Sequence, residues 1–223
     1  MRAPLSIVIP TLNAEAQLPV ALLCLMEGLE AGLLRELIVS DAESTDKTVE
    51  IAQAAGAQVL HGPPGRGGQL ARGCAVARGD WLLILHADTK LSPNWSSVVA
   101  QALEEASPRY FKLRFDATGF GPWVVSRWAN LRARLFSRPF GDQGLLVRRS
   151  DYEAAGGYPD IALMEDIALL RKLPKPRAVH VVAQTSWARY ATYGWVRQGA
   201  GNILRQIRFR LGADPNTLAR KYR

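Results

Sequence analysis

Short apolar runs alternate with helical repeats over the first part of the chain. The apolar runs are typical of buried parallel strands, which we expect at residues 5–9, 36–41, 57–60 and 81–85. Leucines 18, 22, 25 and 29 recur at helical spacing. Further helices are indicated from Ser44 or Asp46 to Gly56, from the glycine-rich loop 62–68 to Gly79, and from Ser92 (N-cap) and Pro93 onward. This alternation predicts an α/β fold, with a mostly parallel central sheet and helices on both faces.

The pattern is less regular in the second part of the chain. Phe111, Leu113 and Phe115 alternate with charged residues, as in a half-exposed strand, and an aromatic-rich helical stretch follows through Trp123 and Trp128. No repeat, low-complexity run or linker interrupts the sequence. We therefore expect a single composite domain over residues 1–223. Its parts are a first half (about 1–92), a second half (about 93–188) and a helical tail (about 189–223).

Composition is that of an ordinary globular protein, with 48% hydrophobic and 22% charged residues. The longest strongly apolar run, at 81–85, is far shorter than the roughly 20 residues that cross a bilayer. No charged-then-apolar leader opens the chain. Cys24 and Cys74 have no partner motif and are expected to be reduced thiols. Together these features predict a cytoplasmic protein.

The net charge of +8 is concentrated in the tail. Between Arg189 and Arg223 there are eight lysines and arginines against one acid, Asp214, so this segment carries +7. Such a segment suits an anionic surface, either lipid headgroups or a phosphorylated ligand. A basic tail alone does not indicate a nucleic-acid reader, and we expect no nucleic-acid partner.

The same tail carries an apolar stripe at helical spacing, with arginines off the stripe. Two interpretations are open. The stripe packs on the protein's own domain or on a partner subunit of a homodimer, or it lies in the plane of a membrane surface, at its inner face, and serves a lipid-linked acceptor. The stripe consists of Val196, Ala200, Ile203, Leu204, Ile207 and Leu211, and the arginines are Arg197, Arg205 and Arg208.

Polar residues follow the predicted strands where each strand ends. Thr11 and Asn13 follow the first strand, Asp41 ends the second, and His86 and Asp88 follow the fourth. In parallel α/β sheets, ligands bind outside the carboxyl ends of the strands. We therefore expect these side chains to meet at one edge of the sheet.

The order and spacing of four short motifs carry a resemblance to a known family. The chain resembles the family-2 inverting glycosyltransferases from about residue 6 to residue 166, which implies a GT-A, Rossmann-like fold with a nucleotide-sugar-binding first half and an acceptor-binding second half. Within that family, residues 141–144 and 63–67 are similar to a small bacterial branch assigned to arsenosugar biosynthesis. The four motifs lie at residues 9–13, 39–46, 85–89 and 164–166.

The resemblance implies a donor site for a nucleotide sugar, most simply a UDP-sugar. Asp41 stands where the family holds the base, Arg66 lies in a loop that approaches the diphosphate, and Arg189 with Tyr190 covers it. From the residues alone, capping by Asp41 and a plain turn at Arg66 stay open as alternatives. The implied donor-site residues are Pro10, Thr11, Asn13, Glu15, Asp41, Arg66, Asp88 and Arg189.

The implied metal site departs from the family's pattern. The family usually places two acids as Asp-x-Asp, whereas this chain has His86-Ala87-Asp88. Asp88 is then the expected ligand of Mn²⁺ or Mg²⁺, with His86 as a further ligand, an orienter of metal-bound water or a contact to the diphosphate. Imidazole favours Mn²⁺. The alternative is that Asp88 is only a turn residue after a strand.

The catalytic assignment also comes from the resemblance. An inverting transfer is one displacement and needs one carboxylate base beside the acceptor hydroxyl. The Glu-Asp motif implies that Asp166 is this base and that Glu165 shapes the acceptor pocket, together with Asp142 and Gln143. The alternative is two acids placed favourably at a helix N-terminus.

Other enzyme classes fit the sequence poorly. A sugar-1-phosphate nucleotidyltransferase or a nicotinamide dehydrogenase would carry a glycine-rich loop directly after the first strand, where this chain has Pro10-Thr11-Leu12-Asn13. The missing first acid of the metal motif keeps another class open, a catalytically silent nucleotide-sugar-binding or membrane-recruitment module. The acceptor is not identified by the sequence.

Overall fold

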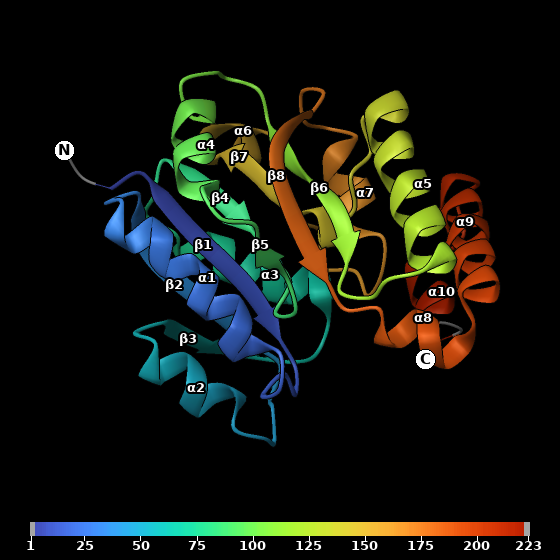
Figure 1. The fold of residues 1–223 in the computed structure, drawn as a ribbon, viewed down its shortest axis with the longest axis horizontal. Helices are drawn as coiled ribbons and strands as arrows, with labels where there is room; N and C mark the ends of the chain where they lie inside the picture. Colours follow the sequence, from blue (N-terminus) through green and yellow to red (C-terminus); the bar gives the residue numbers. More distant parts are fainter. Residues whose placement is uncertain (1–2, 221–223) are drawn as a thin grey trace.

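A computed structural model gives the arrangement of residues 3–220 (Figure 1). Its strands form one sheet in the order β3-β2-β1-β4-β7-β6-β8-β5. The strands are β1 (Leu5–Thr11), β2 (Leu34–Asp41), β3 (Gln58–His61), β4 (Trp81–Ile84), β5 (Lys90–Leu91), β6 (Arg109–Phe115), β7 (Leu145–Arg148) and β8 (Arg177–Thr185). The helices are α1 (Leu18–Glu30), α2 (Thr48–Ala54), α3 (Arg66–Val76), α4 (Trp95–Ala102), α5 (Phe120–Phe136), α6 (Arg149–Ala154), α7 (Glu165–Leu170), α8 (Ala188–Tyr193), α9 (Trp195–Arg210) and α10 (Pro215–Arg220), with a 3-10 turn η1 (Gly141–Gln143).

The four strands predicted in the first part of the chain are confirmed and form the parallel half of the sheet. β1 pairs in parallel with β2 and β4, and β2 pairs in parallel with β3. Their carboxyl ends therefore lie at the same edge. The predicted α/β class with a mostly parallel sheet is correct.

Helices cover both faces of the sheet, as alternate residues of β1 show. Ile7 and Ile9 belong to a core cluster with residues of α1 and α4, whereas Val8 belongs to a second cluster with residues of α3, α6 and α7. All three β1 side chains are fully buried. Burial on both faces explains why this strand has an unbroken apolar sequence.

The helix predicted to start at Ser92 and Pro93 begins two residues later, so that prediction is wrong at its boundary. The Ser92 hydroxyl accepts a hydrogen bond from the Val182 N–H (3.1 Å), which ties this residue to β8. α4 starts at Trp95, and the carboxylate of Glu27 on α1 accepts hydrogen bonds from the N–H groups of Asn94 and Ser96. A carboxylate from another helix, and not a local serine, therefore satisfies the first donors of α4.

The second part of the chain completes the sheet with mixed pairing. The predicted strand around Phe111 is β6, whose residues alternate between buried and exposed, and the predicted aromatic helix is α5. β7 inserts antiparallel between β4 and β6, and the long strand β8 runs parallel to β6. The sequence pattern did not reveal β7 or β8.

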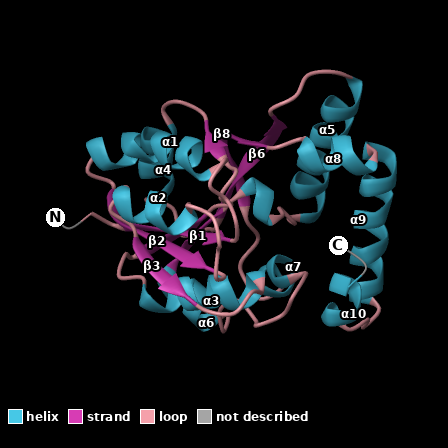
Figure 2. Ribbon diagram, turned by 90° about the horizontal axis from the view of Figure 1, so that it is seen from below, coloured by secondary structure: helices cyan, strands magenta, loops and turns pink. Residues whose placement is uncertain are grey.

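The tail helix α9 turns its polar side toward the protein. Its buried residue is Gln206, whereas five members of the apolar stripe have exposed fractions between 41% and 82%. The interpretation that the stripe packs on the protein's own domain is therefore wrong. Figure 2 shows α9 beside α5, α8 and α10 at one end of the molecule, away from β3 and α2. Lys221 and Arg223, counted in the basic tail, lie outside the described residues.

Cys24 and Cys74 are free thiols, as expected for a reduced protein. Cys74 is buried in the core beside α6, and burial raises its pKa to about 12. Within residues 3–220, none of the helices is both long and apolar enough to cross a membrane.

Candidate active site

One pocket of about 230 Å³ opens at the carboxyl edge of the sheet. Its walls come from segments far apart in the sequence: the start of α3, the loop after β4, the loop around η1, the first turn of α7, and the stretch from the end of β8 into α9. The predicted site residues that line it are Arg66, His86, Asp88, Asp142, Glu165, Asp166 and Arg189. The fold thus brings together the residues expected to bind diphosphate and metal and the expected base.

Asp166 lies in the first turn of α7 and its carboxylate is held from the η1 loop. The Gly141 N–H donates a hydrogen bond to Oδ2 of Asp166 (3.0 Å). A Cβ atom at position 141 would overlap Nε2 of His86 and lie 2.8 Å from Oδ2 of Asp166. Only glycine therefore allows this loop to pass so close to both side chains.

His86 follows β4 and lines the pocket. Desolvation by the surrounding protein lowers its pKa to about 4, and the charge of Arg66 acts in the same direction, whereas Asp88 and Asp166 oppose it. The imidazole is therefore neutral at physiological pH. A neutral imidazole keeps a lone pair, which is the form that binds a metal or accepts a hydrogen bond.

Asp88 is anchored to the neighbouring part of the sheet. Its Oδ2 accepts a hydrogen bond from the Thr185 hydroxyl at the end of β8 (2.9 Å). This bond fixes the carboxylate between two strand ends that the sequence separates by almost half the chain. Thr185 is buried, so the hydroxyl is itself held in place.

The side chains of Asp88 and His86 suit a cation whose coordination the protein alone does not complete. Among residues 3–220, no group of three or more His, Cys, Asp or Glu side chains could hold a metal ion. Asp88 and the neutral His86 supply an oxygen and a nitrogen at the same pocket. Cations that act on nucleotides are commonly bound by one or two protein groups, with phosphate oxygens and water completing the coordination. The residues present fit such an open site.

Glu165 and Arg66, which both line the pocket, form an ion pair. Nη1 of Arg66 lies 3.4 Å from Oε1 of Glu165, whose side chain is almost fully buried. Burial, together with the charge of Asp166, raises the pKa of Glu165 to about 7, and the charge of Arg66 opposes this shift. The pair joins the start of α3 to the start of α7 and holds the guanidinium at the pocket.

Asp142 and its neighbour Gln143 have different roles. Asp142 lines the pocket, and burial raises its pKa to about 6, while the guanidinium of Arg132 opposes the shift. Gln143 is fully buried and does not line the pocket; its Nε2 donates to the Phe111 carbonyl (3.3 Å), and its Oε1 accepts from the Phe140 N–H (3.4 Å). Gln143 therefore stabilises the η1 loop by joining it to β6.

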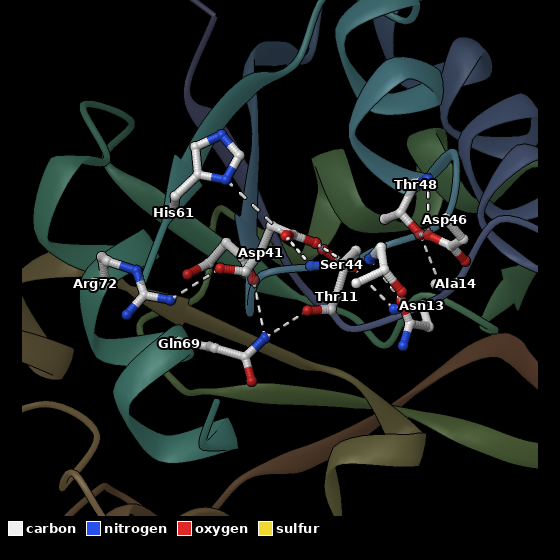
Figure 3. A network of polar contacts seen from close by, with 12 residues as sticks. Thr11, Asn13, Ala14, Asp41, Ser44, Asp46, Thr48, His61, Gln69 and Arg72 are labelled. Carbon is white, nitrogen blue, oxygen red and sulfur yellow. Dashed lines mark hydrogen bonds and ion pairs between the residues drawn. The ribbon is translucent and has the colours of Figure 1, made fainter. Parts of the chain in front are cut away.

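Four of the remaining predicted donor residues, Thr11, Asn13, Glu15 and Asp41, belong to a polar network at the ends of β1 and β2 (Figure 3). None of the four lines this pocket. The Thr11 hydroxyl donates to Oδ1 of Asp41 (2.8 Å), and the carboxylate of Asp41 also accepts from the N–H (2.8 Å) and hydroxyl (2.6 Å) of Ser44. Gln69 on α3, which the sequence did not single out, donates to the carbonyls of Thr11 and Ser40. Asp41 is fully buried, so its contacts lock the two strand ends together.

The exposed part of this network joins two loops. Asn13 has a left-handed backbone (φ 49°), its N–H donates to the Ser44 hydroxyl, and its Oδ1 accepts from the Thr45 N–H. Oε2 of Glu15 accepts from the Lys47 N–H (3.0 Å). Pro10 lies in β1 itself. These contacts fix the backbone conformation of the loop after β1, which is what a ligand-binding loop requires.

The pocket also has a wall that the sequence did not indicate. The inner side of α9 contributes polar residues, of which Asn202 donates to the Tyr190 hydroxyl (3.2 Å) and accepts from Nη2 of Arg205 (2.6 Å). The ring of Tyr190 stacks on Trp187 (centroids 4.7 Å apart). The recurrence of polar residues opposite the apolar stripe, at 198, 202, 205 and 206, was the available signal.

Comparisons with known proteins identify related chains. The chain is 31% identical over 173 residues to a PGL/p-HBAD biosynthesis glycosyltransferase of Mycobacterium tuberculosis, covering 71% of this chain and 64% of that protein. The chain thus spans a little under two thirds of that relative's length. It is also 47% identical over 58 residues to an uncharacterized glycosyltransferase of Rickettsia bellii, which covers 26% of this chain and 20% of that protein.

Solved structures share the fold. Glucosyl-3-phosphoglycerate synthase from Mycobacterium tuberculosis, solved with Mn²⁺, UDP and glucosyl-3-phosphoglycerate, is 25% identical with a TM-score of 0.56 and covers 82% of this chain and 70% of that chain. S. aureus TarS 1-349, solved with UDP-GlcNAc, is 14% identical with a TM-score of 0.59, covering 82% and 58%. These likenesses confirm the GT-A glycosyltransferase fold. The family description "Glycosyl transferase family 2" matches residues 6–164, so this chain belongs to glycosyl transferase family 2.

Proposed function

We propose that the chain transfers a sugar from a nucleoside-diphosphate sugar, most simply a UDP-sugar, to an acceptor hydroxyl with inversion at the anomeric carbon. The observation that carries the proposal is a single pocket in which the carboxylate of Asp166 is fixed by Gly141 and faces the same space as Asp88 and Arg66. Structures of the same fold in complex with UDP-GlcNAc or with UDP and Mn²⁺ support a nucleotide donor.

The donor's diphosphate would be bound by cationic groups on two sides of the pocket. Arg66 approaches from α3 and Arg189 from α8, and guanidinium groups match phosphate oxygens in geometry and charge. Asp88 and His86 would hold Mn²⁺ or Mg²⁺, which supplies positive charge to the leaving diphosphate. The base and ribose would bind along the ends of β1 and β2, at Pro10, Asn13 and Glu15, where the buried pair Thr11 and Asp41 shapes the edge of the sheet from within.

The reaction would be a single displacement. The acceptor oxygen attacks the anomeric carbon from the face opposite the diphosphate, the carbon–oxygen bond to the diphosphate breaks, and the bonding pair leaves with the phosphate. Asp166 accepts the proton of the acceptor hydroxyl. The Gly141 N–H fixes one oxygen of this carboxylate, so the other can be directed at the acceptor.

The acceptor would lie on the side formed by Asp142 and Glu165. Asp142 is half-buried and Glu165 is buried, and their pKa values are raised to about 6 and about 7, so each carries a proton over part of the physiological range. A protonated carboxyl donates one hydrogen bond and accepts another, which suits recognition of a polyhydroxylated acceptor. Gln143 acts on this side by supporting the loop that carries Asp142.

The relation of residues 141–144 to the arsenosugar branch remains a prediction, as does the cytoplasmic location.

The second candidate is a nucleotide-sugar-binding protein without catalysis, favoured by the histidine where the family's first acid stands. The test is transfer itself. The purified chain is incubated with UDP-, GDP- and dTDP-sugars, with and without Mn²⁺, and release of nucleoside diphosphate is measured. Slow donor hydrolysis that requires Mn²⁺ and is lost in Asp166→Asn supports the enzyme. Donor binding by calorimetry without any release, for every sugar and acceptor tried, supports the binder.

A further inference from the structure

The helices α5 and α9 pack side by side at one end of the molecule (Figure 1, Figure 2). Both present large apolar side chains to solvent. On α5 the exposed residues include Phe120, Trp123 and Leu135. On α9 the exposed members of the stripe include Val196 and Leu204. We call these five residues and their two helices the α5–α9 face. An exposed apolar surface of this extent is typical of an interaction site.

The charge on the same helices has one sign. α5 contains three arginines, α8 one and α9 four, and none of the three helices contains an aspartate or glutamate. Arg197 and Arg208 of α9 are exposed. The guanidinium of Arg127 lies 5.3 Å from the ring centre of Trp123, which places a cation within the aromatic part of the face. The surface therefore combines tryptophan, phenylalanine and aliphatic side chains with the exposed arginines Arg127, Arg197 and Arg208.

We propose that the α5–α9 face binds the surface of a membrane that contains anionic lipid. Apolar and aromatic side chains enter the boundary between headgroups and acyl chains, and arginines pair with lipid phosphates and carboxylates. A second copy of the chain fits less well. A two-fold interface places the same patch on both sides, so arginines would face arginines, with no acid on these helices to compensate.

The inverted packing of α9 links this surface to the pocket. One side of the helix carries Asn202 and Arg205, which line the pocket, and the other side carries the exposed stripe. A chain bound through the stripe would therefore hold the pocket directly beside the membrane surface. This explains why a helix of the protein's own domain turns its polar side inward.

The experiment is co-sedimentation of the full chain with vesicles of phosphatidylcholine, with and without phosphatidylserine. Binding is expected with phosphatidylserine only, and it should weaken as salt rises because screening shortens the reach of exposed charges. The double variant Arg197→Glu/Arg208→Glu should reduce binding by about tenfold or more. Its control, Lys47→Glu/Lys90→Glu, makes the same change in net charge on exposed lysines elsewhere and should bind as the wild type does.

The apolar contribution is tested separately. Trp123→Ser/Val196→Ser removes one exposed side chain from each helix and should also weaken binding, whereas Leu23→Ser on α1, whose side chain is 73% exposed, should not. Circular dichroism checks that each variant is folded. Three results would overturn the proposal: no binding to phosphatidylserine vesicles, equal binding by the α5–α9 variants, or a stable dimer in light scattering that Trp123→Ser/Val196→Ser dissociates.

Discussion

The N–H of Gly141 donates a hydrogen bond of 3.0 Å to Oδ2 of Asp166, and this contact joins the η1 loop to the first turn of α7. The close approach depends on the missing side chain, because a Cβ atom at position 141 would overlap the imidazole of His86. The loop, the proposed base and the histidine of the metal motif are therefore packed as one unit.

Replacing Gly141 by alanine is expected to displace His86 or Asp166. Transfer should fall by about 10²-fold or more, since shifts of about 1 Å in catalytic groups have costs of that order. Steady-state kinetics of Gly141→Ala is the measurement. Gly199→Ala is the matched control, because a Cβ there meets no atom within 4 Å and the backbone is helical. Equal activity in Gly141→Ala and Gly199→Ala would contradict the packing argument.

Thr185 is expected to tune the metal site through Asp88. Thr185→Val keeps the shape of the side chain but removes the hydroxyl that donates to Oδ2 of Asp88. The concentration of Mn²⁺ that half-saturates UDP binding should rise several-fold, because outer partners commonly contribute about 10- to 100-fold to metal affinity. Calorimetric titration of UDP at a series of Mn²⁺ concentrations measures it. UDP binding that does not depend on Mn²⁺ in either protein would remove Asp88 from the role of ligand.

Glu165 should make stability depend on pH. Burial raises its pKa from 4.5 to about 7 in the folded protein, so the folded state holds a proton that the unfolded state releases above pH 4.5. The stabilising contribution of that proton is fully present below 4.5 and is lost as the pH rises through 7. Glu165→Gln cannot titrate and should therefore gain stability relative to the wild type between about pH 5 and pH 8. A gain on the order of 1–3 kcal/mol is expected.

Urea denaturation of the wild type and of Glu165→Gln at about pH 5 and about pH 8 measures this gain in stability. The ion pair with Arg66 forms only with the ionised carboxylate, so the pH-dependent difference between the two proteins reports the titration of Glu165 together with this pair. Identical pH dependence in the two proteins would show that Glu165 is ionised throughout.

The parallel half of the fold and much of the site could be predicted because local sequence and position agree there. β1 and β4 are buried on both faces, so their sequences are continuous apolar runs, and the polar residues after them mark the ligand edge. Asp166 lies in the first turn of α7 and lines the pocket together with the expected metal ligand Asp88.

The second part of the chain was harder to predict for physical reasons. β7 has only four residues, and in β8 the apolar Val182 occupies a less buried position, which interrupts the alternation of apolar and polar residues, so neither shows a clear periodicity in the sequence. The pattern of α9 was also misleading, since an apolar stripe normally marks the buried side of a helix. Here the polar side is buried because it lines the pocket, and the polar residues opposite the stripe were the signal for this in the sequence.

The most direct measurement compares Asp166→Asn with Asp88→Asn in donor binding and in transfer. The Asp166→Asn substitution keeps the shape of the side chain, and its amide oxygen can still accept the Gly141 hydrogen bond, but it cannot take the acceptor's proton. Asp166→Asn is therefore expected to bind UDP and Mn²⁺ as the wild type does and to lower turnover by about 10²–10⁴-fold, with an inverted product from the wild type. Asp88→Asn should lose both metal-dependent binding and turnover. Full turnover in Asp166→Asn, or a product that retains the donor's anomeric configuration, would contradict the account.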